Sequence, residues 1–233
     1  MLIAEQQKLF DHPPNEIEQN EFILFDRLEK IKQIIDKHSE ENFYLSFSGG
    51  KDSTVLHYLI DMAVPNNKIP RVFLNTGLEY RLIYKFVKSL QEKDERIVMI
   101  SPRKNIVKTL ERVGYPFKSK NHSVFVEMYQ KGSTAPSLER YLGGEQFGCP
   151  KVLRYHFTPE CKLKISDKCC SEFKKDIFNN WSRENKKSIF ITGMRKQEGG
   201  QRVNINCIVT NKSGEVTRFH PLAVVTDAWE NWF

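Results

Sequence analysis

One stretch of the chain combines glycines, hydroxyl groups, a lysine and an aspartate between two apolar runs. It reads Ser46-Phe47-Ser48-Gly49-Gly50-Lys51-Asp52-Ser53. The run before it, 43–45, predicts a short buried strand, and the run after it, 54–60, predicts a helix. A glycine-rich turn between a strand and a helix presents backbone N–H groups at the positive end of the helix dipole, which suits phosphate. Within such a turn Lys51 adds positive charge, Asp52 could hold a magnesium ion, and the serines add hydroxyl donors.

The order of residues in this loop differs from the Walker pattern, in which four residues separate the first glycine from Gly-Lys-Ser/Thr. The order Ser-Gly-Gly-Lys-Asp-Ser instead resembles the pyrophosphate loop of the PP-loop ATP pyrophosphatases. This superfamily includes phosphoadenosine phosphosulfate reductases, the small subunit of ATP sulfurylase, tRNA thiolation enzymes and GMP synthetase. The resemblance implies that 46–53 binds ATP with magnesium.

Three later segments resemble the phosphosulfate reductase branch of that superfamily. The block 71–80 is similar to the family's Asp-Thr-Gly segment beside the nucleotide, with Asn75 in place of the aspartate. The block 189–202 is similar to Gly-x-Arg-x-x-Glu-x-x-x-Arg, in which two arginines would face phosphate or sulfate and a glutamate could orient an arginine. The block 220–229 is similar to the family's closing Pro-Leu-x-x-Trp-Thr-x-x-Asp-Val-Trp, with Val225 replacing the first tryptophan.

These resemblances define the predicted site. The predicted catalytic residues are Lys51, Asp52, Arg195 and Arg202. The predicted nucleotide-binding residues are Ser46, Ser48, Gly49, Gly50, Lys51, Asp52, Ser53, Asn75, Thr76, Gly77, Gly193, Arg195 and Glu198.

The cysteines leave two interpretations open. Cys169-Cys170 and the lysine that follows resemble the Cys-Cys-x-x-x-Lys segment of adenosine phosphosulfate reductases, where the pair belongs to an iron–sulfur cluster completed by a later Cys-x-x-Cys. This chain has no Cys-x-x-Cys. A 4Fe–4S cluster would need four thiolates, which Cys161, Cys169, Cys170 and Cys207 could supply. The alternative is that all are reduced, partly buried thiols.

Strand and helix patterns alternate along the chain outside 114–185. Apolar runs near 43, 72, 96–100 and 189 predict strands, and helices are expected over 16–38, 54–60 and from 81. This alternation predicts an α/β fold, a doubly wound parallel five-stranded sheet of the adenine nucleotide alpha-hydrolase-like type. We expect one PP-loop domain over 1–233, with an N-terminal arm and helix over 1–40 and a mainly helical insert over 114–185. The pair 205–209 and 216–220 predicts a hairpin.

Composition limits the class of protein. The 233 residues carry a formal net charge of +7, and no apolar run approaches the ~20 residues that span a bilayer. Five cysteines, an odd number, fit a reduced compartment, so we expect a cytoplasmic protein without a membrane partner. The charge excess fits a solvated surface or contact with nucleic acid, tRNA or DNA, and an oligomer is left open. The basic residues that would make this contact are Lys118, Lys120, Lys151, Arg154, Lys162 and Lys164.

The resemblance implies one of two reactions, and a non-catalytic role is the alternative. The chain would cleave ATP between the α and β phosphates to activate a substrate, or would act on an adenylyl sulfate. The reductases rely on a cysteine in a C-terminal Glu-Cys-Gly tail, whereas the last cysteine here is Cys207. Reduction of an adenylyl sulfate by this chain alone is therefore not expected. The alternative is a non-catalytic nucleotide-binding module or subunit that acts with a partner in nucleic-acid modification.

Overall fold

The computed structural model describes residues 16–144 and 148–233, so the arm predicted before residue 15 lies outside the described part. The chain divides into two compact units. The first comprises residues 16–73, 79–99 and 182–233, and the second comprises Leu74–Leu78 and Ile100–Trp181.

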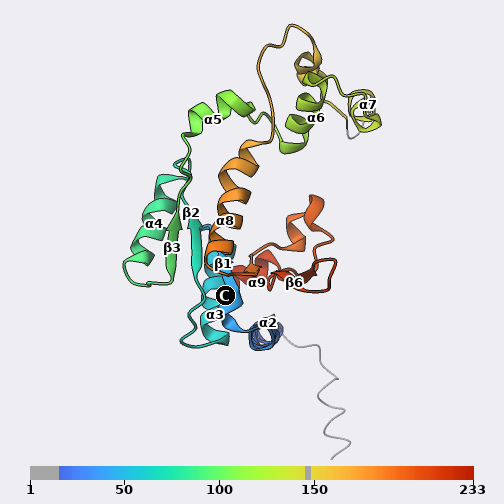
Figure 1. The fold of residues 1–233 in the computed structure, drawn as a ribbon. Coiled ribbons are helices and arrows are strands. Elements are labelled where there is room, and N and C mark those ends of the chain that lie inside the picture. Colours follow the sequence, from blue (N-terminus) through green and yellow to red (C-terminus); the bar gives the residue numbers. More distant parts are fainter. Residues whose placement is uncertain (1–15, 145–147) are drawn as a thin grey trace, which may run out of the picture. The chain divides into compact units, whose positions relative to one another are not determined.

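A six-stranded sheet forms the centre of the first unit (Figure 1). Its order is β3-β2-β1-β4-β6-β5, and β1 pairs in parallel with both β2 and β4, as does β4 with β6. The strands are β1 (Phe43–Ser46), β2 (Arg71–Leu74), β3 (Ile97–Ile100), β4 (Ile189–Ile191), β5 (Ile208–Thr210) and β6 (Val216–Phe219). The strand order reverses between β1 and β4, which confirms the doubly wound arrangement predicted from the sequence.

The sixth strand comes from the hairpin that the sequence predicts. β5 pairs antiparallel with β6, while β6 itself joins the parallel part of the sheet beside β4. Between them Asn211 closes the turn, because its side-chain oxygen accepts hydrogen bonds from the backbone N–H groups of Ser213 (2.9 Å) and Glu215 (3.0 Å). The sheet therefore has one more strand than the expected five, since β5 extends its edge.

The helices of the first unit cover this sheet with apolar residues. They are α2 (Glu16–His38), α3 (Lys51–Ala63), α4 (Arg81–Gln91) and the short α9 (Asp227–Trp232), and α8 (Asp176–Glu184) ends in this unit. Short 3₁₀ turns lie at Glu40–Asn42, Lys196–Glu198 and Gly200–Arg202. Ile31 and Ile35 of α2 and Leu56 of α3 are buried against strand residues such as Phe43. The three- and four-residue spacing of these apolar positions explains why the segments fold as helices with one buried face.

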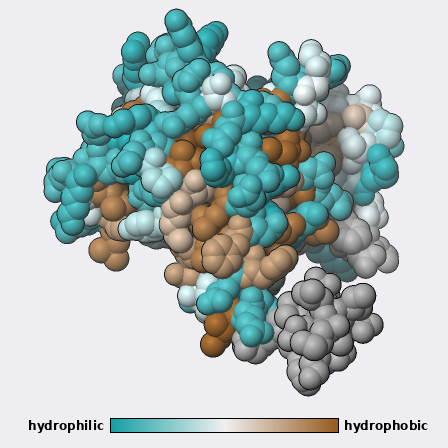
Figure 2. Space-filling view, turned by 90° about the horizontal axis from the view of Figure 1, so that it is seen from below, coloured by the Kyte–Doolittle hydropathy of each residue, from teal (hydrophilic) through white to brown (hydrophobic). Residues whose placement is uncertain are grey.

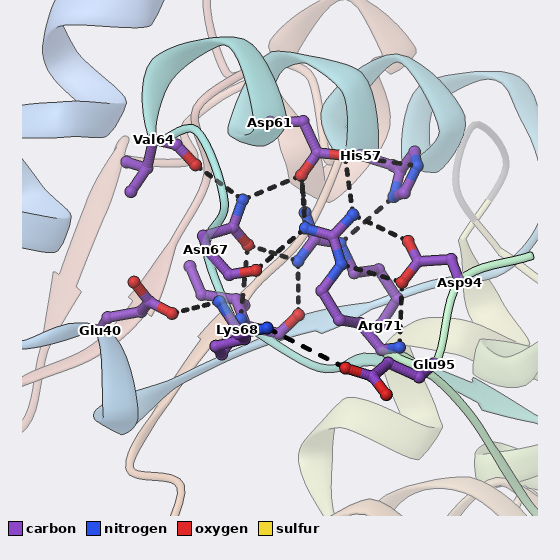
Figure 3. Close-up of polar contacts among 11 residues, drawn as sticks. Glu40, His57, Asp61, Val64, Asn67, Lys68, Arg71, Asp94 and Glu95 are labelled. Atoms are coloured by element: carbon purple, nitrogen blue, oxygen red, sulfur yellow. Dashed lines mark hydrogen bonds and ion pairs between the residues drawn. The ribbon is translucent and has the colours of Figure 1, made fainter.

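A buried ionic cluster lies at the amino end of β2, the edge of the sheet away from the glycine-rich loop (Figure 3). Arg71 is fully buried and donates to His57 Nδ1 (3.2 Å), Asn67 Oδ1 (2.7 Å) and Asp61 Oδ1 (2.7 Å). Arg96 also donates to Asp61, at 2.7 and 2.9 Å. Because both guanidiniums are matched by carboxylates and carbonyls, the cluster reads as a structural element rather than a ligand site.

The second unit is mainly helical. It contains α5 (Ile106–Val113), α6 (Lys120–Gln130), α7 (Pro136–Gly143), a 3₁₀ turn (Lys151–Phe157) and a π-helical turn (Ser171–Lys175) that leads into α8. Its own core includes Val126, Leu138, Tyr141, Phe157 and Ile165. Two histidines lie inside it: His122 is fully buried, and its ring nitrogens are 2.9 Å from the Tyr141 hydroxyl and 3.0 Å from His156.

Some large apolar side chains remain at the surface. Figure 2 shows hydrophobic surface interrupted by hydrophilic side chains on one face of the molecule. On α2, Phe22 and Phe25 are largely exposed. Within the described residues, no helix is both long enough and apolar enough to cross a bilayer.

Candidate functional site

The glycine-rich loop follows β1 and leads directly into α3. Its two serines hold it closed: the hydroxyls of Ser48 and Ser53 lie 3.1 Å apart, and Ser53 Oγ donates to the backbone oxygen of Gly50 at 3.0 Å. The backbone N–H of Ser48 also donates to Ser53 Oγ (3.2 Å). Ser53 is buried, so its hydroxyl acts as an internal brace of the loop rather than as the free donor that the sequence suggests.

The two glycines of the loop have different roles. Gly49 has a φ of +70°, and a Cβ on it would lie 2.7 Å from Val87 Cγ2 and 3.0 Å from Ile83 Cγ2 of α4. A side chain there is therefore excluded both by conformation and by space. Gly50 has an ordinary φ of −84°, and its Cβ would meet only Ser48 Oγ, at 3.4 Å. The first glycine fits the loop against α4, whereas the second leaves the mouth of the loop open.

The end of β4 lies directly against the first turn of α3. A Cβ on Gly193 would lie 2.9 Å from Asp52 Cβ and 3.1 Å from the Asp52 carbonyl, so only glycine fits there. Two residues later the guanidinium of Arg195 reaches the same point, with Nη2 3.5 Å from Asp52 Oδ1. Because β1 and β4 flank the reversal of strand order, these residues meet where ligands bind in sheets of this type.

Two acidic residues of α9 complete the arrangement. Arg195 Nη1 lies 2.7 Å from Asp227 Oδ1, and its Nη2 lies 3.4 Å from Glu230 Oε2. The ammonium of Lys51 lies 3.1 Å from the same Glu230 oxygen. The sequence prediction missed Asp227 and Glu230 as site residues. Their spacing of three places them on one face of a helix, but nothing local indicates that this face meets the loop.

The electrostatics of the site reflect this crowding of charges. Burial, and then the nearby charge of Asp52, raise the pKa of Glu230, while Lys51 and Arg195 oppose the shift. The ion pair with Arg195 lowers the pKa of Asp227. Burial disfavours the charge of Arg195, yet the surrounding carboxylates hold its pKa above the usual value. The cations at the mouth of the loop are therefore neutralised by the chain's own carboxylates.

Glu198 and Arg202 follow Arg195 in the chain and pair with each other. Glu198 accepts the backbone N–H of Arg195 at 2.9 Å, and its other oxygen pairs with Arg202, whose side chain is about half exposed. Thus Glu198 fixes the loop that carries Arg195, and the structure does not bring Arg202 to Lys51 or Asp52. Asn75, Thr76 and Gly77 belong to the second unit, where the side chain of Asn75 accepts the N–H of Gly77 (3.0 Å).

The residues present fit the predicted magnesium ion better than the predicted iron–sulfur cluster. Magnesium commonly takes one or two protein carboxylates and completes its shell with phosphate oxygens, which suits Asp52 at the loop. For a cluster, Cys161, Cys169 and Cys170 lie in the second unit and Cys207 lies in the first. Across residues 16–144 and 148–233, no three Asp, Glu, His or Cys residues are grouped to hold a metal ion. Burial also raises the pKa of the Cys169 and Cys207 thiols, opposite to what thiolate ligation needs. We therefore derive no step through a cluster.

Comparison with known proteins places this geometry in a family. A family model described as the phosphoadenosine phosphosulfate reductase domain matches residues 42–229, which include the loop, Arg195 and the first half of α9. The chain belongs to this family. As a phosphoadenosine phosphosulfate reductase domain, it is also a member of the PP-loop superfamily with the adenine nucleotide alpha-hydrolase-like fold.

Solved structures share the fold at low identity, and one curated relative matches part of the chain. An FMN adenylyltransferase from Candida glabrata matches at a TM-score of 0.53 and 12% identity, over 97% of this chain and 58% of the other. The yeast FAD synthetase in complex with FAD matches at 0.50 and 13%, over 96% and 60%. An uncharacterised protein of Methanocaldococcus jannaschii is 34% identical over 103 residues, which are 40% of this chain and 25% of the relative. The chain thus spans a quarter of the length of that relative and about three fifths of those structures.

Proposed function

We propose that this phosphoadenosine phosphosulfate reductase domain is an enzyme that binds an adenine nucleotide at the loop and cleaves ATP between its α and β phosphates. The observation that carries the proposal is the meeting of Lys51, Asp52 and Arg195 at the reversal of strand order, beside a loop held closed by its own serines. Open backbone N–H groups at the start of α3 favour an anion there, and the loop has no Walker order that would direct attack to the γ phosphate.

In this mechanism the β and γ phosphates occupy the loop as one leaving group. The ammonium of Lys51 and the N–H groups of the loop stabilise the charge that builds on departing pyrophosphate. Magnesium, held by Asp52 and phosphate oxygens, would neutralise part of the same charge. Arg195 faces the α phosphate, where a nucleophilic atom of the acceptor forms a bond to phosphorus as the bond to the bridging oxygen breaks.

Binding requires an exchange of partners at the loop. Lys51 and Arg195 are paired with Glu230 and Asp227 in the structure. Phosphate oxygens would have to replace these carboxylates, so α9 shifts or its carboxylates reorient when the nucleotide enters. The family description favours one second candidate, an adenylyl sulfate as the ligand of the same site. Its sulfate or phosphate would use Lys51 and Arg195 in the same way.

ATP labelled in the α or in the γ position tests the reaction. We expect label from the α position in AMP or an adenylylated product and label from the γ position in pyrophosphate. The Lys51→Ala variant should lose this turnover, whereas Lys212→Ala, in the exposed turn between β5 and β6, should retain it. ADP and phosphate as the main products would overturn the mechanism. Thiol-dependent sulfite from an adenylyl sulfate would instead favour the second candidate.

A further inference from the structure

The positive charge of the chain is concentrated in one segment. The whole chain has 36 Lys and Arg against 29 Asp and Glu. The segment Ile100–Trp181 holds 15 of these basic residues and 8 of the acidic ones, and the rest of the chain holds 21 of each. The second unit therefore carries the entire net excess, while the nucleotide-binding unit is balanced. A charge asymmetry of this kind indicates an anionic ligand for the charged part.

A cavity of about 730 Å³ lies wholly within this unit. It is bounded by the end of α5, by α6 and by the segment 159–168. Five of the twelve lining residues are basic and two are acidic. The basic ones are Arg112, Lys131, Lys162, Lys164 and Lys168, and Glu127, Glu172, Gln130 and Cys161 are among the others. The volume falls within the ~300–1,000 Å³ range of pockets that take small organic ligands. It suits one nucleotide-sized molecule.

The two glutamates pair with three of these five bases, and Glu172 also pairs with Lys104. Glu127 pairs with Lys131 and with Lys168 (2.7 Å), and Glu172 pairs with Arg112 (3.0 Å). Lys162 and Lys164 have different partners: within the described part of the chain, their recorded contacts are backbone carbonyls, of Pro159 and Arg112 respectively. Two ammonium groups at the cavity are thus available to an anion, because a neutral carbonyl is a weaker partner than a phosphate oxygen.

The wall that carries these lysines is held in place before any ligand binds. The side chain of Gln130 donates to the Leu163 carbonyl (2.7 Å) and accepts from the Ile165 N–H (3.2 Å). On the other side, Tyr115 N–H donates to the Lys164 carbonyl at 2.9 Å. Gly114 makes this approach possible, since a Cβ there would lie 3.0–3.1 Å from the backbone of 164–166. A wall fixed from both sides lowers the entropy that ligand binding must overcome.

We propose that this cavity is a second anion-binding site, separate from the glycine-rich loop, which takes the phosphate group of a small molecule of mononucleotide size. Lys162 and Lys164 are its principal contacts, and Arg112 shares its charge between Glu172 and the ligand. The site gives the domain a place for a second substrate that also bears phosphate.

Calorimetry with inorganic pyrophosphate tests the proposal. The wild-type chain should bind two equivalents, one at the loop and one in the cavity. The double variant Lys162→Ala/Lys164→Ala should lose one equivalent, or bind it at least tenfold more weakly. The matched control Lys174→Ala/Lys175→Ala removes the same charge from exposed positions of the same unit and should keep both equivalents. Retention of both by the cavity variant would overturn the proposal.

A loop variant separates this proposal from the proposed function. Gly50→Val/Lys51→Ala should keep the single cavity equivalent. If that variant binds no pyrophosphate, the cavity proposal fails. If the wild type binds one equivalent that only the cavity variant loses, the loop assignment fails and the cavity stands.

Alkylation of Cys161 provides a readout that needs no substitution. Cys161 lines the cavity and is partly exposed, as is Cys170, which does not line it. Pyrophosphate should slow the reaction of Cys161 with N-ethylmaleimide at least fivefold and leave Cys170 unchanged, as read by peptide mass spectrometry. Equal rates at Cys161 with and without pyrophosphate would contradict the proposal. Protection of Cys161 by a single-stranded oligonucleotide at tenfold lower concentration than AMP would mean that the cavity binds nucleic acid and not a small molecule.

Discussion

The carboxylate of Glu230 lies 3.1 Å from the ammonium of Lys51, so a residue 179 positions later in the sequence holds the lysine of the glycine-rich loop. The Glu230 side chain is fully buried and lies 3.4 Å from Arg195 as well. In an enzyme that binds phosphate at this loop, Glu230 competes with the ligand for both cations.

Removing that competition should strengthen nucleotide binding. We expect Glu230→Gln to bind ATP several-fold more tightly, since the amide keeps the shape of the side chain but not its charge. Isothermal titration calorimetry measures the change, and Glu215→Gln in the exposed hairpin turn is the control. Weaker binding by Glu230→Gln would mean that the carboxylate supports the site instead.

The two glycines of the loop should respond differently to alanine. Gly49→Ala forces a side chain into a φ of +70° and against Val87, so we expect a loss of about 2–4 kcal/mol in the free energy of unfolding. Gly50→Ala meets only Ser48 Oγ and should change stability by less than about 1 kcal/mol. Urea denaturation of both variants tests the difference. Equal losses would contradict the fit of Gly49 against α4.

The two predicted arginines should also differ. Arg195→Ala leaves the buried Glu230 without one of its two cations, and we expect a loss of about 3–5 kcal/mol in stability together with loss of ATP binding. Arg202→Ala breaks only a partly exposed pair with Glu198 and should cost less than about 1 kcal/mol. The milder Arg195→Lys keeps the charge and should keep the fold, while binding ATP at least tenfold more weakly. Normal ATP affinity in Arg195→Lys would remove that residue from the site.

The ionic cluster at the amino end of β2 should make the fold sensitive to acid. Hydrogen bonds from Arg96 lower the pKa of Asp94 to about 2 from its ordinary 3.8. A carboxylate with a depressed pKa adds stability above pH ~4, and this contribution is lost as the pH falls from there toward 2. Asp94→Asn should therefore lose less stability than wild type between pH 5 and pH 2.5. Glu95→Gln, its highly exposed neighbour, should behave as wild type, and urea melts at each pH compare the three.

Local sequence patterns were sufficient to predict the glycine-rich loop and its position between a strand and a helix. Three elements could be predicted because residues a few positions apart determine them. They are the strand before Ser46, the helix after Lys51 and the hairpin around Asn211. Parallel strands present their carboxyl ends at one edge of a sheet, but this rule does not say which residues touch, and the contact between Gly193 and Asp52 was not predicted.

Local sequence patterns could not predict contacts between segments that are distant in the sequence. Asp227 stands at the aspartate of the closing motif that 220–229 resembles, whereas nothing around Glu230 indicates that α9 packs against the loop. The hydrogen bond from Ser53 to the Gly50 carbonyl was not predicted either, since a serine that braces a turn and one that faces a ligand have the same sequence pattern. The wall that carries Lys164 depends on Gln130, which lies at the end of α6 and is distant in sequence.

The anchoring of α9 couples the packing of the first unit to the charges beside the glycine-rich loop. Trp229 donates its indole N–H to the Asn20 carbonyl of α2 at 2.9 Å, and the ring of Phe233 stacks on it at 5.4 Å. Phe233 is therefore packed on the helix that carries Glu230. Loss of its ring would loosen α9, and the carboxylate that holds Lys51 and Arg195 would move with that helix.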